Sequence, residues 1–278
     1  MKTRTAVVAG SFYPGTKKEI DNLLDRIFSH EKQNIQTGLS TKDIIGAVVP
    51  HAGYIFSAYE AVHVFEILGK SPVKYDTFFI INPNHTGYGM EIEVDSNEQW
   101  NTPLGSVEID TDFVNHLDLP ISNTAQLREH SAEVMLPFLQ KWISYPFKIV
   151  PICILRQNPL TSTEIAEKIY KANQILKKKI FIIASSDFSH YVDPDKGKEK
   201  DTLVLNELEK LDSQHLYDTV VRNRISVCGY GPIMTLIEYA KLVSKKPETT
   251  ILARGNSGKT MPSSSVVDYV SILFHQSA

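Results

Sequence analysis

The sequence of 278 residues contains only two cysteines, Cys153 and Cys228. A disulfide framework is therefore not how this protein is stabilised, and so little cysteine is typical of a reducing compartment. No run of apolar residues approaches the roughly 18 that a membrane-spanning helix needs. The N-terminal stretch also lacks the long apolar segment of a secretory signal peptide. We therefore expect a cytoplasmic protein without a membrane span.

An excess of positive charge is also missing, since 29 Lys and Arg residues face 32 Asp and Glu residues. This balance argues against nucleic acid or an anionic membrane as the partner. The sequence has no HExxH, no CxxC and no GxxxxGK[ST] motif. The usual zinc-protease, zinc-ribbon and P-loop interpretations therefore have no support.

The chain does contain short apolar runs rich in β-branched residues, which are typical of buried strands. These runs are Ile44–Val49, Thr77–Ile81, Lys148–Leu155 and Ile180–Ser185, followed by TTILARG and Ser265–Phe274 near the C-terminus. The more alternating stretch Glu91–Ser96 suits an exposed or antiparallel strand.

Helical patterns lie between these runs, for example at Lys17–Phe28 and Ser57–Leu68. Ser57 is a candidate N-cap, and Thr161 followed by Glu164 predicts a capping box for a third helix. The polar stretch His30–Asp43 is expected to be a surface loop. Alternating strands and helices predict a single α/β domain over residues 1–278, with a largely parallel, twisted sheet and helices on both faces.

Three of the nine histidines directly follow predicted strands. His51 lies in PHAGY after Ile44–Val49, His85 lies in NPNHTGYG after Thr77–Ile81, and SDFSHY after Ile180–Ser185 carries Asp187 and His190. Sites in open α/β sheets form outside the carboxyl ends of the strands. We therefore expect these side chains to converge on one cleft.

Two further segments carry reactive groups. Glu129 and His130 precede an apolar helical pattern, and Cys228 lies in the glycine-rich turn SVCGYGP before a helix. A cysteine at a helix N-terminus tends to have a lowered thiol pKa. Imidazole and thiolate are good ligands for zinc, copper or iron. We therefore predict a mononuclear metal site built from His51, His85 and Cys228.

The predicted supporting groups are Asp187, His190 and His130, which would transfer protons or hold the ligands in place. Simpler interpretations stay open at this point. A histidine after a strand is often an ordinary hydrogen-bonded loop residue, Cys228 can be a buried filler, and Asp187 can cap a turn. Cys153, inside an apolar strand, is expected to be such a filler.

Six segments together resemble the MEMO family (mediator of ErbB-driven cell motility), in the family's own order and across most of the chain. They are GSFYP at Gly10–Pro14, PHAGY at Pro50–Tyr54, NPNH at Asn82–His85, EHSAEVMLPFL at Glu129–Leu139, SSDFSHY at Ser185–Tyr191 and CGYGPI at Cys228–Ile233. Phe12 stands where the animal protein has a tryptophan.

The resemblance implies a fold similar to the LigB-type class III extradiol dioxygenases, which hold non-haem iron(II) with two histidines and a glutamate. In the MEMO family the ligands are two histidines and a cysteine, which match His51, His85 and Cys228, while Asp187, His190 and His130 match neighbouring cleft residues. Animal members are linked to copper- or iron-dependent redox chemistry and to phosphotyrosine-peptide binding. Microbial members resemble protein B of the AmmeMemoRadiSam system, whose partners are an AMMECR-type protein and a radical SAM protein.

Three functions follow as expectations. The first is a metal-dependent oxidoreductase with iron or copper, in which thiolate in place of carboxylate argues against ring cleavage itself. The second is a non-catalytic metal-containing module that binds a peptide or protein, with Phe12, Tyr13 and Tyr54 as aromatic surface. The third is a zinc hydrolase with Asp187 or Glu129 as general base.

Overall fold

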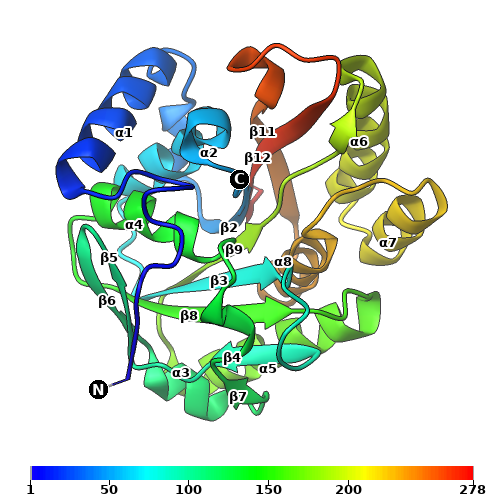
Figure 1. Ribbon diagram of the computed structural model, residues 1–278. Coiled ribbons are helices and arrows are strands. Elements are labelled where there is room, and N and C mark those ends of the chain that lie inside the picture. The colour runs from blue at the N-terminus through cyan, green and yellow to red at the C-terminus, as the bar shows by residue number, and fades with distance from the viewer. Residues whose placement is uncertain (1, 278) are drawn as a thin grey trace.

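The computed structural model describes residues 2–277, whose strands join in one mixed sheet (Figure 1). Its order is β1-β5-β6-β8-β3-β9-β2-β12-β10, with β11 paired to β12, β4 to β8 and β7 to β4. The strands are β1 (Thr3–Arg4), β2 (Ile44–Val49), β3 (Thr77–Pro83), β4 (Ile92–Asp95), β5 (Gln99–Thr102), β6 (Gly105–Ile109), β7 (Ile121–Ser122), β8 (Lys148–Ile154), β9 (Ile180–Ser185), β10 (His190–Val192), β11 (Pro247–Asn256) and β12 (Val266–Gln276).

Helices flank this sheet. They are α1 (Lys17–Glu31), α2 (Tyr54–Gly69), α3 (Thr111–His116), α4 (Leu136–Trp142), α5 (Pro159–Leu176), α6 (Pro194–Glu209), α7 (Ser213–Arg222) and α8 (Tyr230–Val243), with short 3₁₀ turns η1 (Thr37–Thr41), η2 (Ala125–Leu127), η3 (Glu133–Met135) and η4 (Ser257–Lys259). Helices α2 and α4 pack together on one side of the strands, and α5 and α8 pack together on the other (Figure 1). The predicted α/β class is confirmed.

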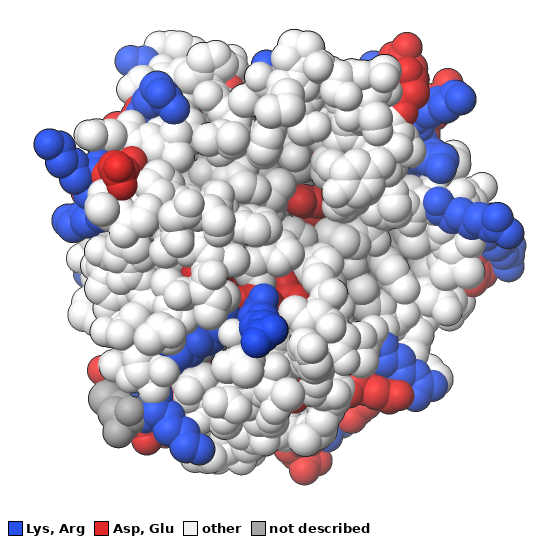
Figure 2. All heavy atoms as spheres, viewed as in Figure 1, with Lys and Arg blue, Asp and Glu red and all other residues white. Residues whose placement is uncertain are grey.

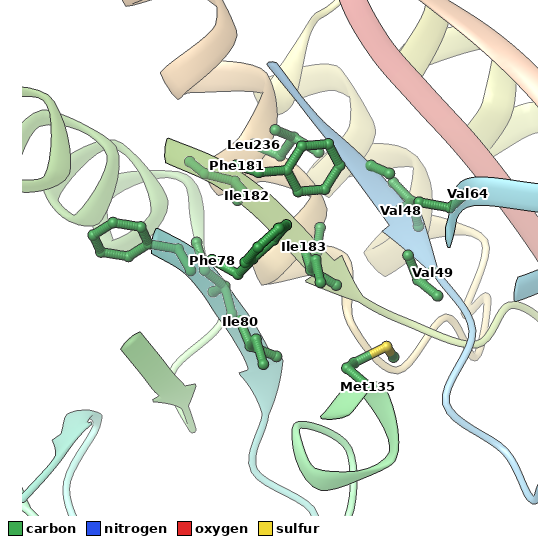
Figure 3. Close-up of a cluster of buried hydrophobic side chains, with 14 of the residues drawn as sticks. Val48, Val49, Val64, Phe78, Ile80, Met135, Phe181, Ile182, Ile183 and Leu236 are labelled. Carbon is green, nitrogen blue, oxygen red and sulfur yellow. The ribbon is translucent and has the colours of Figure 1, made fainter. Parts of the chain in front are cut away.

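The parallel part of the sheet is its buried centre. Strands β8, β3, β9 and β2 pair parallel in that order, and nearly every residue in them is buried. Strands covered on both faces need continuous apolar runs, which is why these four were visible in the sequence. Figure 3 shows side chains from neighbouring strands, such as Val48, Ile80 and Ile182, packed in one cluster with Leu236 of α8.

Antiparallel strands flank this centre. β12 pairs antiparallel with β2 and with β11, and β4 pairs antiparallel with β8. Ile92–Asp95 pairs antiparallel with β8, as its alternating sequence predicted, but it also pairs parallel with β7 and is mostly buried instead of exposed. Among residues 2–277, no helix is both long and apolar enough to cross a membrane.

Two predicted helix starts are wrong. Helix α2 begins at Tyr54 after Gly53, and the Ser57 hydroxyl donates to the carbonyl of Ala52 instead of capping the helix. Helix α5 begins at Pro159, because the Asn158 side chain accepts from the backbone N–H of Thr161. In both cases helical residues precede the predicted cap, so the polar side chain lies inside the first turn.

The expected surface loop His30–Asp43 is partly helical. Its first two residues complete α1, and residues 37–41 form η1. The rest is largely exposed, as its polar sequence predicted.

Candidate metal centre

The parallel pairing of β2, β3 and β9 places their carboxyl ends at one edge of the sheet. His51 follows β2, His85 follows β3, and Asp187 and His190 follow β9. In Figure 1 the arrowheads of β3 and β9 end near the middle of the molecule, and Figure 2 shows a hollow there with acidic atoms in it and a basic side chain beside it. The expected convergence of these loops is therefore present.

Three of the predicted residues form a compact set of metal-binding atoms. One ligand atom each from His51, His85 and Cys228 lies within 4.8 Å of the others. The Nε2 atom of His51 is 3.2 Å from the sulfur of Cys228, and the two imidazole rings meet edge to face with centroids 5.1 Å apart. Ligands of one tetrahedral metal ion are separated by about 3.5 Å, so this spacing fits a single ion.

The neighbours of His51 determine its tautomer. The Ser185 hydroxyl is 2.7 Å from Nδ1 of His51 and donates its single hydrogen to the carbonyl of Ser131, also at 2.7 Å. The Ser185 oxygen therefore accepts from Nδ1–H, because its own proton is already used. The lone pair of His51 is left on Nε2, which faces Cys228.

Glu129 does the same for His85. One carboxylate oxygen of this fully buried glutamate is 2.9 Å from Nδ1 of His85, and the other accepts from the His85 backbone N–H at 2.7 Å. A carboxylate only accepts, so Nδ1 carries the proton and Nε2 is free to bind metal. These bonds outweigh the cost of burial and lower the pKa of Glu129 to about 2.

The pKa expected for Cys228 is wrong. Burial raises it well above the ordinary thiol value, and the nearby carboxylate of Asp187 raises it further. Cys228 lies in a turn before α8, where any benefit from the helix terminus is smaller than the cost of placing a thiolate in a buried site. A metal cation would reverse this balance, since a coordinating thiol is deprotonated.

Asp187 holds the two halves of the site together. Its Oδ1 accepts from the backbone N–H of His51 at 2.7 Å, and its own backbone N–H donates to the sulfur of Cys228 at 3.2 Å. The carboxylate thus reaches another segment of the chain instead of capping its own turn. Burial raises the pKa of Asp187 to about 6, although the hydrogen bond from the His51 backbone N–H opposes the shift.

His130 lies against the predicted ligands. Its ring stacks on His85 with centroids 4.8 Å apart and meets Phe12 at 4.4 Å. Burial lowers the pKa of His130 to about 4, so the ring is neutral at neutral pH. His85, Glu129 and His130 also form a compact donor set, but its shared oxygen is the one that orients His85.

His190 lies nearer the surface on β10. Its Nδ1 is 2.6 Å from the carbonyl of Phe188 and 2.8 Å from that of Ser226, so Nδ1 is protonated and Nε2 is the free nitrogen. The site therefore contains three imidazoles held by neighbours, at His51, His85 and His190, and a fourth, His130, packed between aromatic rings.

Sequence reasoning missed the residues that shape the Cys228 turn. A side chain at Gly229 would collide with Ser185 and Ser186, so this glycine lets the turn approach the end of β9. Gln157 donates to the Cys228 carbonyl and accepts from the N–H of Gly231. Gly229 and Gly231 thus make room for neighbouring parts of the protein, namely Ser185, Ser186 and Gln157. Ser185 itself could have been found from the sequence, because it is the first residue of the segment SSDFSHY.

The expected aromatic surface is largely absent. Tyr13 and Tyr54 are only 2% and 1% exposed, and their hydroxyls donate to Glu133 and to the Val134 carbonyl. Phe12 alone of the three lies at the site. Cys153 is fully buried, as expected of a filler.

Comparison with known proteins identifies the family. Residues 4–273 match the model of the Memo-like protein family. The chain belongs to this family. A MEMO1 family protein of Sulfolobus acidocaldarius is 39% identical, with 98% of this chain and 99% of that protein covered. One from Methanosarcina mazei is 36% identical over the same shares of both chains.

A solved structure shares the fold of this Memo-family chain. The uncharacterized protein JW3007 of Escherichia coli K12 has a TM-score of 0.52 at 13% identity, covering 83% of this chain and 99% of that one. The family model and these relatives confirm, over nearly the full length, the Memo-family assignment inferred from six short segments.

Proposed function

We propose that His51, His85 and Cys228 bind one transition-metal ion, iron or copper, and that the protein is a metal-dependent oxidoreductase. The observation that carries this proposal is the matched pair of tautomers. Ser185 and Glu129 hold the Nδ1 protons of the two histidines, which leaves both Nε2 lone pairs for a metal. A histidine that is only hydrogen-bonded within its loop does not need a second histidine oriented in the same way beside a thiol.

The donor set fits these metals. Two imidazoles and a thiolate suit copper, iron or zinc, and three protein ligands leave positions for dioxygen or a substrate. Such a bound ion would supply one-electron chemistry at the base of the cleft. The carboxylate of Glu129 is hydrogen-bonded to Nδ1 of His85 and to backbone N–H groups. It is therefore occupied and does not serve as the third metal ligand, which agrees with the thiolate of Cys228 in that role.

Other side chains of the site have separate roles in this proposal. Neutral His130, beside His85, orients a bound substrate, and His190 offers its free Nε2 for proton transfer at the outer part of the site. Asp187 is a positioning residue, since it fixes the His51 backbone and contacts Cys228 through its own N–H. A partner interaction with AMMECR-type and radical SAM proteins is proposed from family resemblance.

A metal-containing binding module is the second candidate. Phe12, whose ring covers His130, is the observation in its favour, and peptide or small-molecule binding at this ring needs no turnover. The zinc-hydrolase alternative is weaker. With both oxygens engaged and a pKa of about 2, Glu129 is a poor general base at neutral pH.

Metal analysis of protein purified without added metal tests the site. We expect stoichiometric iron or copper in the wild type and loss of it in His51→Ala and Cys228→Ala. His215→Ala, at an exposed histidine, and Cys153→Ala, at the buried cysteine, are matched controls that should keep the metal.

Unchanged metal content in both site variants would refute the proposed ligands. Oxygen consumption by the metal-loaded wild type, absent from the His51→Ala variant, separates the oxidoreductase from the binding module. Zinc alone, together with ester or amide hydrolysis, would favour the hydrolase.

A further inference from the structure

A second cavity lies between α1, α2, β11 and η4, and none of its lining residues belongs to the metal centre. These elements lie together in the upper part of Figure 1. The cavity has a volume of about 650 Å³, within the usual range of small-molecule sites. Aromatic side chains, Phe56 and Tyr59, form part of its lining beside ionisable groups.

Glu60 of α2 is the first residue of this cavity with an unmet hydrogen-bonding requirement. The residue is 2% exposed, and its Oε1 is 3.0 Å from the Lys259 ammonium. Its Oε2 is buried and has no hydrogen-bond partner. Gly255 of β11 makes this arrangement possible, because any side chain there would collide with the Glu60 carboxylate. A buried, unpaired carboxylate oxygen is costly and calls for a donor.

His63 of α2, one turn further along, is the second such group. Its Nε2 is 3.2 Å from a carboxylate oxygen of Glu31, so Nε2 carries the proton. Burial lowers the pKa of His63 and keeps the ring neutral. Its Nδ1 is therefore an acceptor, and it is also buried without a partner.

The charges around the cavity do not balance. Two carboxylates, Glu31 and Glu60, face the single ammonium of Lys259. Arg254 also lines the cavity, but its guanidinium donates to the Lys198 carbonyl at 2.9 Å and lies 3.7 Å from Asp201. One carboxylate charge is thus left without a cation. Two acceptor atoms, Oε2 of Glu60 and Nδ1 of His63, are left without a hydrogen-bond donor.

We propose that this cavity binds a small organic cation, with a primary ammonium or guanidinium group that donates to Oε2 of Glu60 and Nδ1 of His63. The aromatic rings of Phe56 and Tyr59 suit such a cation, since ring faces attract positive charge. The inference does not depend on the metal centre, because it uses none of its residues.

Calorimetric titration of the full chain with n-butylammonium, n-butylguanidinium and neutral n-butanol tests this proposal. We expect saturable binding of one or both cations and none of the alcohol. Glu60→Gln removes the charge and keeps the shape, and it should weaken binding about tenfold or more, as for a lost hydrogen bond to a charged group. Lys259→Met should strengthen binding several-fold, because it frees Oε1 and removes a competing cation.

The decisive result is that the two variants change the binding affinity in opposite directions. Lys259→Met leaves the buried Glu60 carboxylate without its ammonium, so circular dichroism checks that both variants are folded, and the wild-type preference for the cations over the alcohol decides the matter where a variant does not fold. Glu209→Gln, which removes an exposed carboxylate elsewhere, should leave binding unchanged. The proposal is overturned by absence of cation binding in the wild type and Lys259→Met, or by acetate binding that Lys259→Met abolishes.

Discussion

A buried pair of carboxyl groups beneath the metal centre predicts a distinctive pH dependence of stability. Asp201 and Asp268 are 0% and 4% exposed, and each carboxyl group shifts the pKa of the other. Two buried carboxylates in such close interaction repel each other unless they share a proton. In agreement with this, neither Oδ2 atom has an ordinary donor, and Gly197 leaves space where a side chain would collide with Asp268.

The direction of the effect follows from the pKa of Asp268. Burial first, and then the charge of Asp201, raise this pKa to about 7 from the ordinary 3.8. The folded protein thus keeps a proton that the unfolded chain releases near pH 4. The free energy of unfolding should fall as pH rises from about 4 to about 7 and then level off. The difference between the pKa values of 3.8 and about 7 sets a ceiling of about 4 kcal/mol on this loss.

Other charged groups around the pair come from β11. Arg254 lowers the pKa of both carboxyls, and Asn256 lowers that of Asp268. The pKa of about 7 already includes these contacts, and screening by nearby solvent leaves an expected loss of about 2–4 kcal/mol. The pair also holds the loop of the metal centre, because Asp201 accepts from Ser189 and the Asp268 backbone exchanges bonds with Phe188 and Ser189.

Urea denaturation of the wild type and of Asp268→Asn, across this pH range, measures the effect. The asparagine amide can donate to Asp201, so the variant needs no shared proton. Relative to the wild type, the variant should gain about 2–4 kcal/mol between about pH 4 and about pH 8. Glu209→Gln controls for loss of one exposed charge. Wild-type and Asp268→Asn curves that stay parallel across the range would refute the shared proton.

Two further predictions concern the core. Gly46→Ala in β2 should lower the free energy of unfolding by about 1–3 kcal/mol or more, because the added Cβ would lie 2.7 Å from Leu236 and still closer to the Ile182 carbonyl. Gly38→Ala, in open space, is the control and should be nearly neutral in the same urea experiment. Arg4→Met should cost about 3–5 kcal/mol by leaving buried Glu133 without its guanidinium partner, which lies 2.6 Å away. In thermal or urea unfolding, adding Glu133→Gln should recover part of that loss, and equal stability of single and double variants would contradict the ion-pair argument.

The sequence predicted the centre of the fold well. The bounds of β2 and β9 match Ile44–Val49 and Ile180–Ser185 to the residue. Strands buried on both faces consist of continuous apolar runs, so their pattern is visible locally. The short strands β1, β5 and β6 were missed, since two to five mixed residues carry no period. Their positions depend on contacts such as the one between Arg4 and the Trp100 ring.

The site divides in the same way. The parallel order of the strands, together with histidines placed just after them, was enough to predict that His51 and His85 would meet Cys228. The roles of Ser185 and Glu129 could not be predicted, because a hydrogen bond between residues 44 or 134 positions apart depends on the packed backbone. The thiol pKa was mispredicted for a related reason: burial, which only the fold determines, outweighs the helix terminus.

The sequence by itself thus determined which residue types stand at the strand ends, and so which kind of chemistry the cleft can hold. Hydrophobic periodicity and turn residues are local properties, and they decide strand and helix identity. The tertiary structure alone decided tautomers, proton affinities and unpaired atoms, such as those of His51, Cys228 and Glu60. These properties arise from desolvation and from partners distant in the chain, which exist only when the chain is packed.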